Sequence, residues 1–181
     1  MSKLEEKKLS STEYYRNPFL HIHEDTVRLP DGGESKRIVV THIGAVNVIA
    51  LTEEKELLLV RQYRYPLGCE TIETPAGKLE IGEEPAVTAK RELEEETGYT
   101  CGSLTLLGTH ASAPGFTNER LHQFLAHDVK KLATPVAGDV DEFTELYPLG
   151  KDQALMMVAT GEIQDLKTVY AIQYLTLAGL W

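Results

Sequence analysis

Residues 77–99 constrain this chain more than any other segment, because they place many carboxylates in a short span between two glycines. Their sequence is GKLEIGEEPAVTAKRELEEETGY. Proline suits the first position of a helix, since its missing N–H has no intrahelical partner there. A glycine in the left-handed conformation commonly follows the last helical residue. The segment therefore predicts a helix that begins near Glu84-Pro85 and ends at Gly98.

Three carboxylates of this helix are expected on one face. At about 100° per residue, Glu92, Glu95 and Glu96 fall within roughly a quarter to a third of the circumference. Arg91 lies four residues before Glu95, a spacing at which side chains meet on a helix surface. The adjoining stripe is predicted to anchor the helix to a core through Ala86, Ala89 and Leu93.

Such a cluster has two interpretations. Carboxylates this close repel unless cations lie among them, and Mg²⁺ or Mn²⁺ with oxygen ligands meets that need. Alternatively, the segment is a solvated acidic helix with ordinary surface ion pairs, which is how most charge runs behave. Composition alone favours the second interpretation, and the fixed spacing of the residues favours the first.

That spacing matches a known motif. Gly77, five residues, Glu83, seven residues and then RELEEETGY, residues 91–99, resemble the Nudix box G-x5-E-x7-R-E-U-x-E-E-x-G-U, in which U is a bulky apolar residue. Every specified position is met, so a chance match is very improbable. The resemblance implies a loop–helix–loop that binds divalent metal and hydrolyses a nucleoside diphosphate linked to another group.

Composition narrows the partners. A chain of 181 residues fits one domain, here with a small N-terminal addition. A formal net charge of -10 disfavours a nucleic-acid backbone as partner. Cys69 and Cys101 are too few for a disulfide framework, and we expect them to be thiols in a reducing compartment. With no apolar leader and no membrane span, the sequence predicts a soluble cytoplasmic protein.

The order of elements predicts an α/β (α+β) fold, an α/β/α sandwich with a mixed sheet. Residues 1–42 are assigned to an N-terminal β-strand and antiparallel hairpin region, and residues 43–181 to the main domain with the box at 77–99. The first twenty residues are either a frayed tail or a strand. A hairpin is expected to turn at Pro30–Gly33, between strands 21–29 and 37–41. Further strands are expected at 44–52, 56–63, 70–75, 103–110, 120–127 and 143–149, and helices at 151–160 and 166–180.

Two features outside the box are candidates for substrate contact. Arg61 and Arg64 end a predicted strand, where they could bind phosphate or could simply be solvated cations. The turn-rich loop 113–119 could hold a ligand or only connect two strands. A second acidic cluster follows later in the chain, at Asp139, Asp141, Glu142 and Glu145.

The resemblance extends beyond the box. ETPAGK at residues 73–78, Pro114-Gly115, and the closing residues 161–163 and Lys167-Thr168 are similar to the ADP-ribose pyrophosphatase branch of the Nudix hydrolases. This likeness covers nearly the whole chain. It implies hydrolysis of ADP-ribose to AMP and ribose 5-phosphate with two or more Mg²⁺, or Mn²⁺ as a substitute.

The resemblance also implies residue roles. The metal ligands would be Glu92, Glu95, Glu96 and the Ala76 carbonyl, with Arg91 orienting the glutamates and Glu95 counted also among the catalytic residues. The general base would come from the late acidic loop, as Glu142 or alternatively Asp141. The substrate would be held by a set of polar positions and one loop glycine: Arg37, Arg64, Glu73, Lys78, Gly115 and Glu119.

The branch exchanges its N-terminal strands between subunits to bind adenine, which implies a domain-swapped homodimer here. Two positions depart from the branch: Ala113, where serine is usual, and Thr74, where a bulky aliphatic residue is usual. Both border the pocket, so the substrate preference stays open. GDP-mannose or another nucleoside diphosphate sugar is the alternative substrate, and a non-catalytic regulator that binds a nucleotide sugar is the alternative of a different class.

Overall fold

The protein is described by a computed structural model, which covers residues 2–134, 136, 138 and 143–181. The chain divides into two compact units, Met1–Gly44 with Thr109–Leu121, and Ala45–Gly108 with His122–Trp181. The helices are α1 (Pro85–Thr97), α2 (Lys151–Thr160) and α3 (Leu166–Leu177), and a 3₁₀ turn, η1, spans Tyr65–Leu67. The strands are β1 (Lys7–Arg16), β2 (Leu20–Arg28), β3 (Glu34–His42), β4 (Ala45–Ile49), β5 (Val60–Arg64), β6 (Cys69–Glu73), β7 (Ala76–Lys78), β8 (Tyr99–Thr100), β9 (Ser103–Ala111), β10 (Arg120–His127), β11 (Lys130–Lys131) and β12 (Thr144–Leu146).

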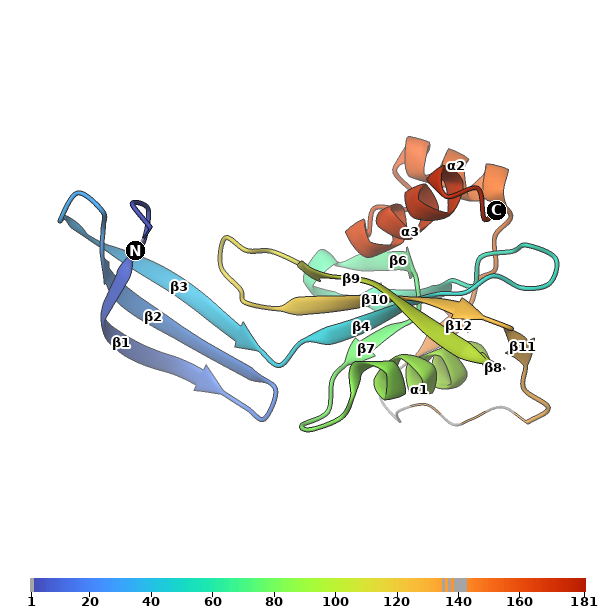
Figure 1. The fold of residues 1–181 in the computed structure, drawn as a ribbon, viewed down its shortest axis with the longest axis horizontal. Coiled ribbons are helices and arrows are strands. Elements are labelled where there is room, and N and C mark those ends of the chain that lie inside the picture. The colour runs from blue at the N-terminus through green and yellow to red at the C-terminus, as the bar shows by residue number, and fades with distance from the viewer. Residues whose placement is uncertain (1, 135, 137, 139–142) are drawn as a thin grey trace. The chain divides into compact units, whose positions relative to one another are not determined.

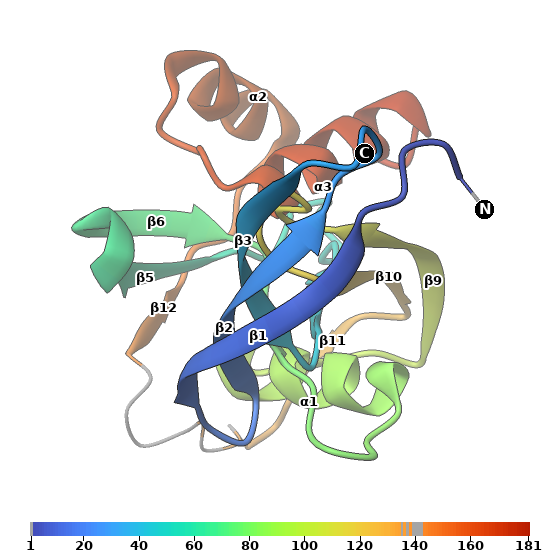
Figure 2. The same ribbon diagram turned by 90° about the vertical axis from the view of Figure 1, so that its left-hand side faces the viewer.

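The N-terminal unit is an antiparallel sheet in the order β1-β2-β3 (Figure 2). The predicted turn joins β2 to β3, and Gly32 there has a φ of 91°, which glycine adopts readily. The N-terminal residues, for which a tail and a strand were both open, form β1 along β2. The loop between β9 and β10, residues 112–119, pairs with β3, where the Val40 N–H donates to the Phe116 carbonyl at 2.8 Å.

The larger unit is an α/β/α sandwich. Its four-stranded sheet has the order β7-β4-β10-β9, with α1 on one face and α2 and α3 on the other (Figure 1). β7 runs antiparallel to β4, whereas β4 and β10 run in the same direction in Figure 1, so the sheet is mixed as predicted. A second sheet in this unit has the order β12-β5-β6.

Two apolar cores explain why β4 is hydrophobic at nearly every position. Because side chains alternate across a strand, Val46 and Val48 pack with Leu93 of α1, whereas Ile49 packs with Ile172 of α3. The strand is thus buried on both faces, which confirms the expectation from its continuous apolar sequence.

Some predicted boundaries were wrong. In the predicted strand 56–63 a ladder begins only at Val60, because Leu57 forms single bridges to Leu51 and Leu149. The last helix ends at Leu177, since Gly179 takes a left-handed φ of 65°. Ala86 is exposed, so only Ala89 and Leu93 of the predicted apolar stripe reach the core. Among the described residues, the helices are too short or too polar to cross a membrane.

Candidate active site

Helix α1 has the ends that its sequence predicted. Glu84 is its N-cap with extended dihedrals, and proline follows at the first helical position. Gly98 takes a left-handed φ of 72° and donates its N–H to the Glu94 carbonyl at 3.0 Å. The cap residues therefore fix the length of the helix and, with it, which carboxylates face β7.

Consecutive residues of β7 meet carboxylates one helical turn apart on α1. The Ala76 N–H donates to Glu96 Oε2 at 2.9 Å. A Cβ placed on Gly77 would lie 1.9 Å from Glu92 Oε1 and 2.7 Å from its Cγ. The first glycine of the box is therefore required by close approach: only a residue without a side chain leaves room for the buried Glu92.

The guanidinium of Arg91 lies among three carboxylates of the box. Arg91 Nη1 donates to Glu92 Oε1 at 2.9 Å and to Glu95 Oε2 at 3.0 Å, and Nη2 lies 3.5 Å from Glu83 Oε2. Burial alone would lower the pKa of Arg91, but the three carboxylates outweigh it and raise that pKa further above its ordinary range. We call Arg91 with Glu83, Glu92, Glu95 and Glu96 the box cluster.

Glu83 has a structural partner of its own. Thr88 Oγ1 donates to Glu83 Oε2 at 2.7 Å, which ties the loop before α1 to the first turn of the helix. This hydrogen bond, together with Arg91, lowers the pKa of Glu83 and keeps it ionised. The box cluster thus sets four carboxylates against one guanidinium.

The donor set of the box cluster fits a hard divalent cation. Carboxylate and carbonyl oxygens are the ligands that Mg²⁺ and Mn²⁺ prefer, and the negative charge in excess of Arg91 favours a cation. As the side chains lie, no three acidic, histidine or cysteine residues of the described part are grouped to hold a metal. Glu92 and Glu95 point to Arg91 and Glu96 to the Ala76 N–H, so metal binding requires these carboxylates to turn.

A second group of charged residues precedes the box in the chain or packs against the residues that precede it. In this group two cations share one carboxylate, whereas in the box cluster several carboxylates share one cation. Arg64 at the end of β5 donates Nε and Nη2 to the two carboxylate oxygens of Glu73 on β6, both at 2.8 Å. Lys167 of α3 also pairs with Glu73. We call Arg64, Glu73 and Lys167 the Glu73 cluster. The hydrogen bonds to Glu73 are the main cause that raises the pKa of Arg64 above its ordinary range, and the charge of Glu96 in the box adds to that effect.

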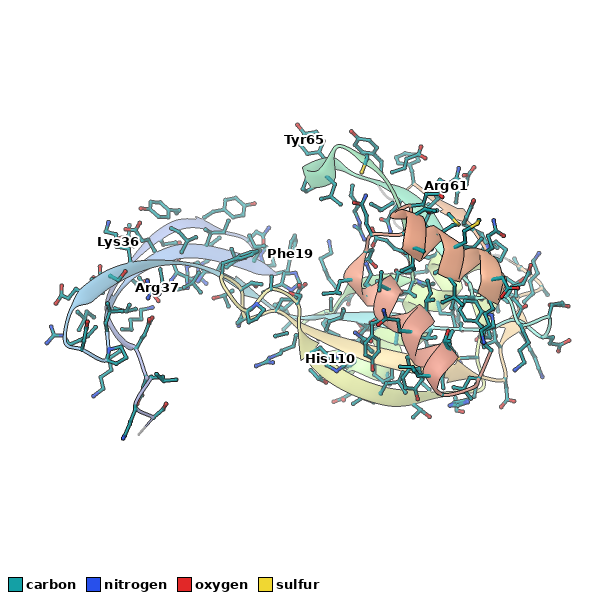
Figure 3. All side chains as sticks on the ribbon, turned by 90° about the horizontal axis from the view of Figure 1, so that it is seen from above. Phe19, Lys36, Arg37, Arg61, Tyr65 and His110 are labelled. Carbon is teal, nitrogen blue, oxygen red and sulfur yellow. The ribbon has the colours of Figure 1, made fainter. Side chains whose placement is uncertain are left out.

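The carboxyl of Glu73 is buried and stays ionised. Burial by itself would raise its pKa, but Arg64, Lys167 and the Thr71 hydroxyl lower it to about 2. The β5–β6 hairpin that carries this pair ends in η1, where Tyr65 projects outward (Figure 3). Arg61, the other candidate arginine, lies over the Tyr147 ring at 4.4 Å instead of joining the Glu73 cluster.

The remaining predicted substrate residues are distributed over both units. Lys78 is exposed at the end of β7, opposite Ala45. Arg37, Gly115 and Glu119 belong to the N-terminal unit. There Arg37 lies on the three-stranded sheet (Figure 3) and donates to Glu6 at 2.6 and 3.0 Å, and Glu119 lies 3.4 Å from His42 Nδ1. Glu142 and Asp141, the two candidates for the general base, lie outside the described residues.

Sequence reasoning gave no role to the first turn of α3. Lys167 and Thr168 were noted there only as part of a likeness, yet their side chains contact Glu73 and the Thr74 N–H respectively. Asp165 and Thr168 do carry a local signal, an Asp at an N-cap whose carboxylate accepts the backbone N–H three residues on. That signal predicts the start of a helix and says nothing of its distant partners.

Comparison with known proteins identifies the family. The sequence profile described as NUDIX domain matches residues 41–165. The chain belongs to the Nudix family. It is therefore a Nudix hydrolase, and its residues 6–40 match a second profile, the nucleoside diphosphate sugar hydrolase N-terminal domain.

Relatives of this Nudix hydrolase match along nearly its full length. An "ADP-ribose pyrophosphatase" of Bacillus subtilis (strain 168) is 45% identical over 177 residues, which are 98% of this chain and 96% of that protein. A "methanol dehydrogenase activator" of Bacillus methanolicus is 46% identical over 178 residues, again 98% and 96%. The solved structure of an "ADP compounds hydrolase" has a TM-score of 0.82 at 18% identity, covering 99% of this chain and 98% of that one, and shares its fold.

Proposed function

We propose that this Nudix hydrolase cleaves the diphosphate of ADP-ribose, giving AMP and ribose 5-phosphate. The observation that carries the proposal is the pairing of an acid-rich box cluster with a cationic Arg64 within its electrostatic range. A metal-bound diphosphate presents cations, which acidic residues bind, and anionic oxygens, which an arginine binds. The full-length relative named ADP-ribose pyrophosphatase supports the choice of substrate.

Different residues are proposed to bind the metal, to bind the phosphate and to accept the proton. Glu92, Glu95, Glu96 and the Ala76 carbonyl would hold two or more Mg²⁺ or Mn²⁺ ions, which lower the pKa of water and stabilise charge on phosphate when bound. Arg91 keeps the glutamates oriented. Arg64 binds a phosphate, and Glu142, or Asp141, takes the proton of the attacking water. One P–O bond forms to the water oxygen, the bridging P–O bond breaks, and the leaving phosphate takes up a proton.

We further propose a homodimer in which residues 1–42 of one subunit contribute to the substrate site of the other. The three-stranded N-terminal sheet exposes several large apolar side chains: Leu9, Tyr14, Tyr15 and Ile38. An exposed group of this kind favours burial against another protein surface. The two free cysteines, of which Cys101 is buried, agree with action in the reducing cytoplasm.

The test is turnover with Mg²⁺ on ADP-ribose, GDP-mannose and NADH side by side. We expect ADP-ribose to be preferred with AMP as product, and Glu96→Gln to lower kcat at least about a hundredfold, because a ligand for the metal is lost. Glu94→Gln is the matched control on the same helix, since Glu94 occupies an unspecified position of the box. It is expected to keep activity within about threefold.

Other outcomes separate the alternatives. Preference for GDP-mannose would retain the mechanism and replace the substrate. Binding of nucleotide without turnover of any of the three would favour a regulator and contradict the proposal. The mass of the same preparations in solution, measured by light scattering, tests the homodimer, and a monomer would contradict that part.

A further inference from the structure

The buried Glu73 carboxylate is the centre of a four-donor network. Its Oε1 accepts from Arg64 Nε at 2.8 Å and from Thr71 Oγ1 at 2.6 Å. Its Oε2 accepts from Arg64 Nη2 at 2.8 Å and from Lys167 Nζ. A bidentate pair with an arginine already orients a carboxylate. The contact with Lys167 is therefore not needed to orient Glu73, and we ask what else it does.

Lys167 is itself held in place by the end of its helix. The Asp165 carboxylate accepts from the backbone N–H and the hydroxyl of Thr168, at 3.0 and 2.6 Å, and lies 3.0 Å from Lys167 Nζ. The Thr168 hydroxyl in turn accepts the Thr74 N–H at 2.8 Å. Two consecutive residues of α3 therefore bind Glu73, the last residue of β6, and Thr74, which follows it. Both lie shortly before Ala76 and Gly77. α3 and β6 lie side by side (Figure 1).

Lys167 adds a second cation to the Glu73 carboxylate. Its own charge is balanced by Asp165, which lies 3.0 Å from Nζ, so the four groups together are neutral. Within this set Glu73 Oε2 is shared between Arg64 and Lys167, and Glu73 therefore neutralises the guanidinium less completely than it would in an isolated pair. Among the described residues, the remaining guanidinium nitrogen, Arg64 Nη1, has no hydrogen-bond partner, and nearly half of the Arg64 side chain is exposed. Arg64 is thus positioned to donate to an anion while Glu73 holds its other two nitrogens.

We propose that Lys167 is a positioning residue for the substrate: by sharing the Glu73 carboxylate it holds Arg64 in the orientation from which Nη1 can donate to a phosphate of the diphosphate. This inference rests on the proposed function, because it assigns Arg64 to the substrate. Lys167 itself is almost covered and pairs with two carboxylates. It acts through Arg64 and does not touch the substrate.

The experiment compares Lys167→Met, Lys167→Arg and Arg64→Met with the native protein. We expect Lys167→Met to raise KM for ADP-ribose roughly tenfold with kcat within about twofold, since Arg64 binds the phosphate equally in substrate and transition state. Affinity for AMP, measured by calorimetry, should weaken by a similar factor. Lys167→Arg should restore most of both values, and Lys151→Met, at the start of α2, is the matched control and should change neither.

A double variant decides whether Lys167 acts through Arg64. Lys167→Met combined with Arg64→Met should bind AMP no more weakly than Arg64→Met alone. Full additivity, or an unchanged KM and AMP affinity in Lys167→Met, would overturn the inference. A native protein that binds AMP but does not hydrolyse ADP-ribose would contradict the proposed function, whereas the AMP measurements would still test Lys167.

Discussion

The box cluster and the Glu73 cluster use the same two ingredients in opposite proportion. In the box cluster one arginine lies among four carboxylates, and in the Glu73 cluster one carboxylate is shared by an arginine and a lysine. The first therefore retains negative charge, whereas the second is balanced only because Asp165 also pairs with Lys167. This difference agrees with the proposed function, in which the box cluster would bind the metal and Arg64 of the Glu73 cluster would bind a phosphate of the substrate.

The largest effect is expected from disturbing the box cluster at Gly77. Gly77→Ala places a Cβ where the buried Glu92 side chain lies, so Glu92 must leave its position next to Arg91. We expect kcat for ADP-ribose to fall about a hundredfold, with a loss of stability of about 1–3 kcal/mol from overpacking. Steady-state kinetics and thermal unfolding measure the two effects.

The control for that variant is Gly150→Ala at the N-cap of α2. A Cβ there meets nothing within 4 Å, and the residue has ordinary dihedrals. Activity should be retained within about twofold. Full activity in Gly77→Ala would mean that the position of Glu92 does not matter for the reaction, and the contrast between the two clusters would lose its functional meaning.

An intermediate effect is expected from removing the one acid of the Glu73 cluster. The pKa of Glu73 in the folded protein is about 2, below its ordinary value of 4.5. Its ionisation therefore contributes stability above about pH 4.5, and that contribution is lost as pH falls toward 2. Glu73→Gln should be less stable than the native protein by about 2 kcal/mol at neutral pH, and the difference should shrink between pH 4.5 and 2.

Denaturant unfolding at a series of pH values measures this difference. Glu53→Gln, at an exposed turn, should change the free energy of unfolding by less than about 0.5 kcal/mol throughout. If the difference for Glu73→Gln is constant with pH, the carboxylate is not the group that the two cations stabilise.

The smallest effect is expected from removing the one base of the box cluster. Arg91→Met leaves Glu83, Glu92 and Glu95 to repel one another, which we expect to cost about 1–2 kcal/mol, or roughly 2–8 °C in Tm, in metal-free buffer. Added Mg²⁺ should reduce the difference in stability between Arg91→Met and the native protein, since a bound cation can screen the carboxylates in place of Arg91. Arg61→Met removes an equally exposed arginine and should show no such dependence on Mg²⁺. A difference in Tm that Mg²⁺ leaves unchanged would contradict the view that the ion and Arg91 screen the same carboxylates.

The sequence predicted what local rules determine. Pro85 and Gly98 set the ends of α1, and Gly161 ended α2 as expected, because both kinds of residue act on their own backbone. The continuous run of apolar residues predicted that β4 is buried on both faces. Ala86 was misplaced because the width of a buried stripe depends on which sheet the helix packs against.

The site could be predicted only where its residues are neighbours in the chain. The box spans one loop and one helix, so its spacing alone indicated which carboxylates share a face, and the contacts of Arg91 with Glu92 and Glu95 follow from positions one and four residues apart. The Glu73 cluster joins residues 94 positions apart. No periodicity encodes such a contact, because it depends on how β6 and α3 pack in the finished fold.

That long-range contact sets an order of events when the chain is made. Synthesis proceeds from the N-terminus, so every residue of the box exists before Lys167 and Thr168 are added. A chain that stops short of α3 would contain the whole motif by which the family is known. It would lack the two side chains that bind Glu73 and Thr74, the residues leading into that motif. A nascent or truncated enzyme is therefore expected to complete the Glu73 cluster, the proposed phosphate site, after the box cluster, the proposed metal site.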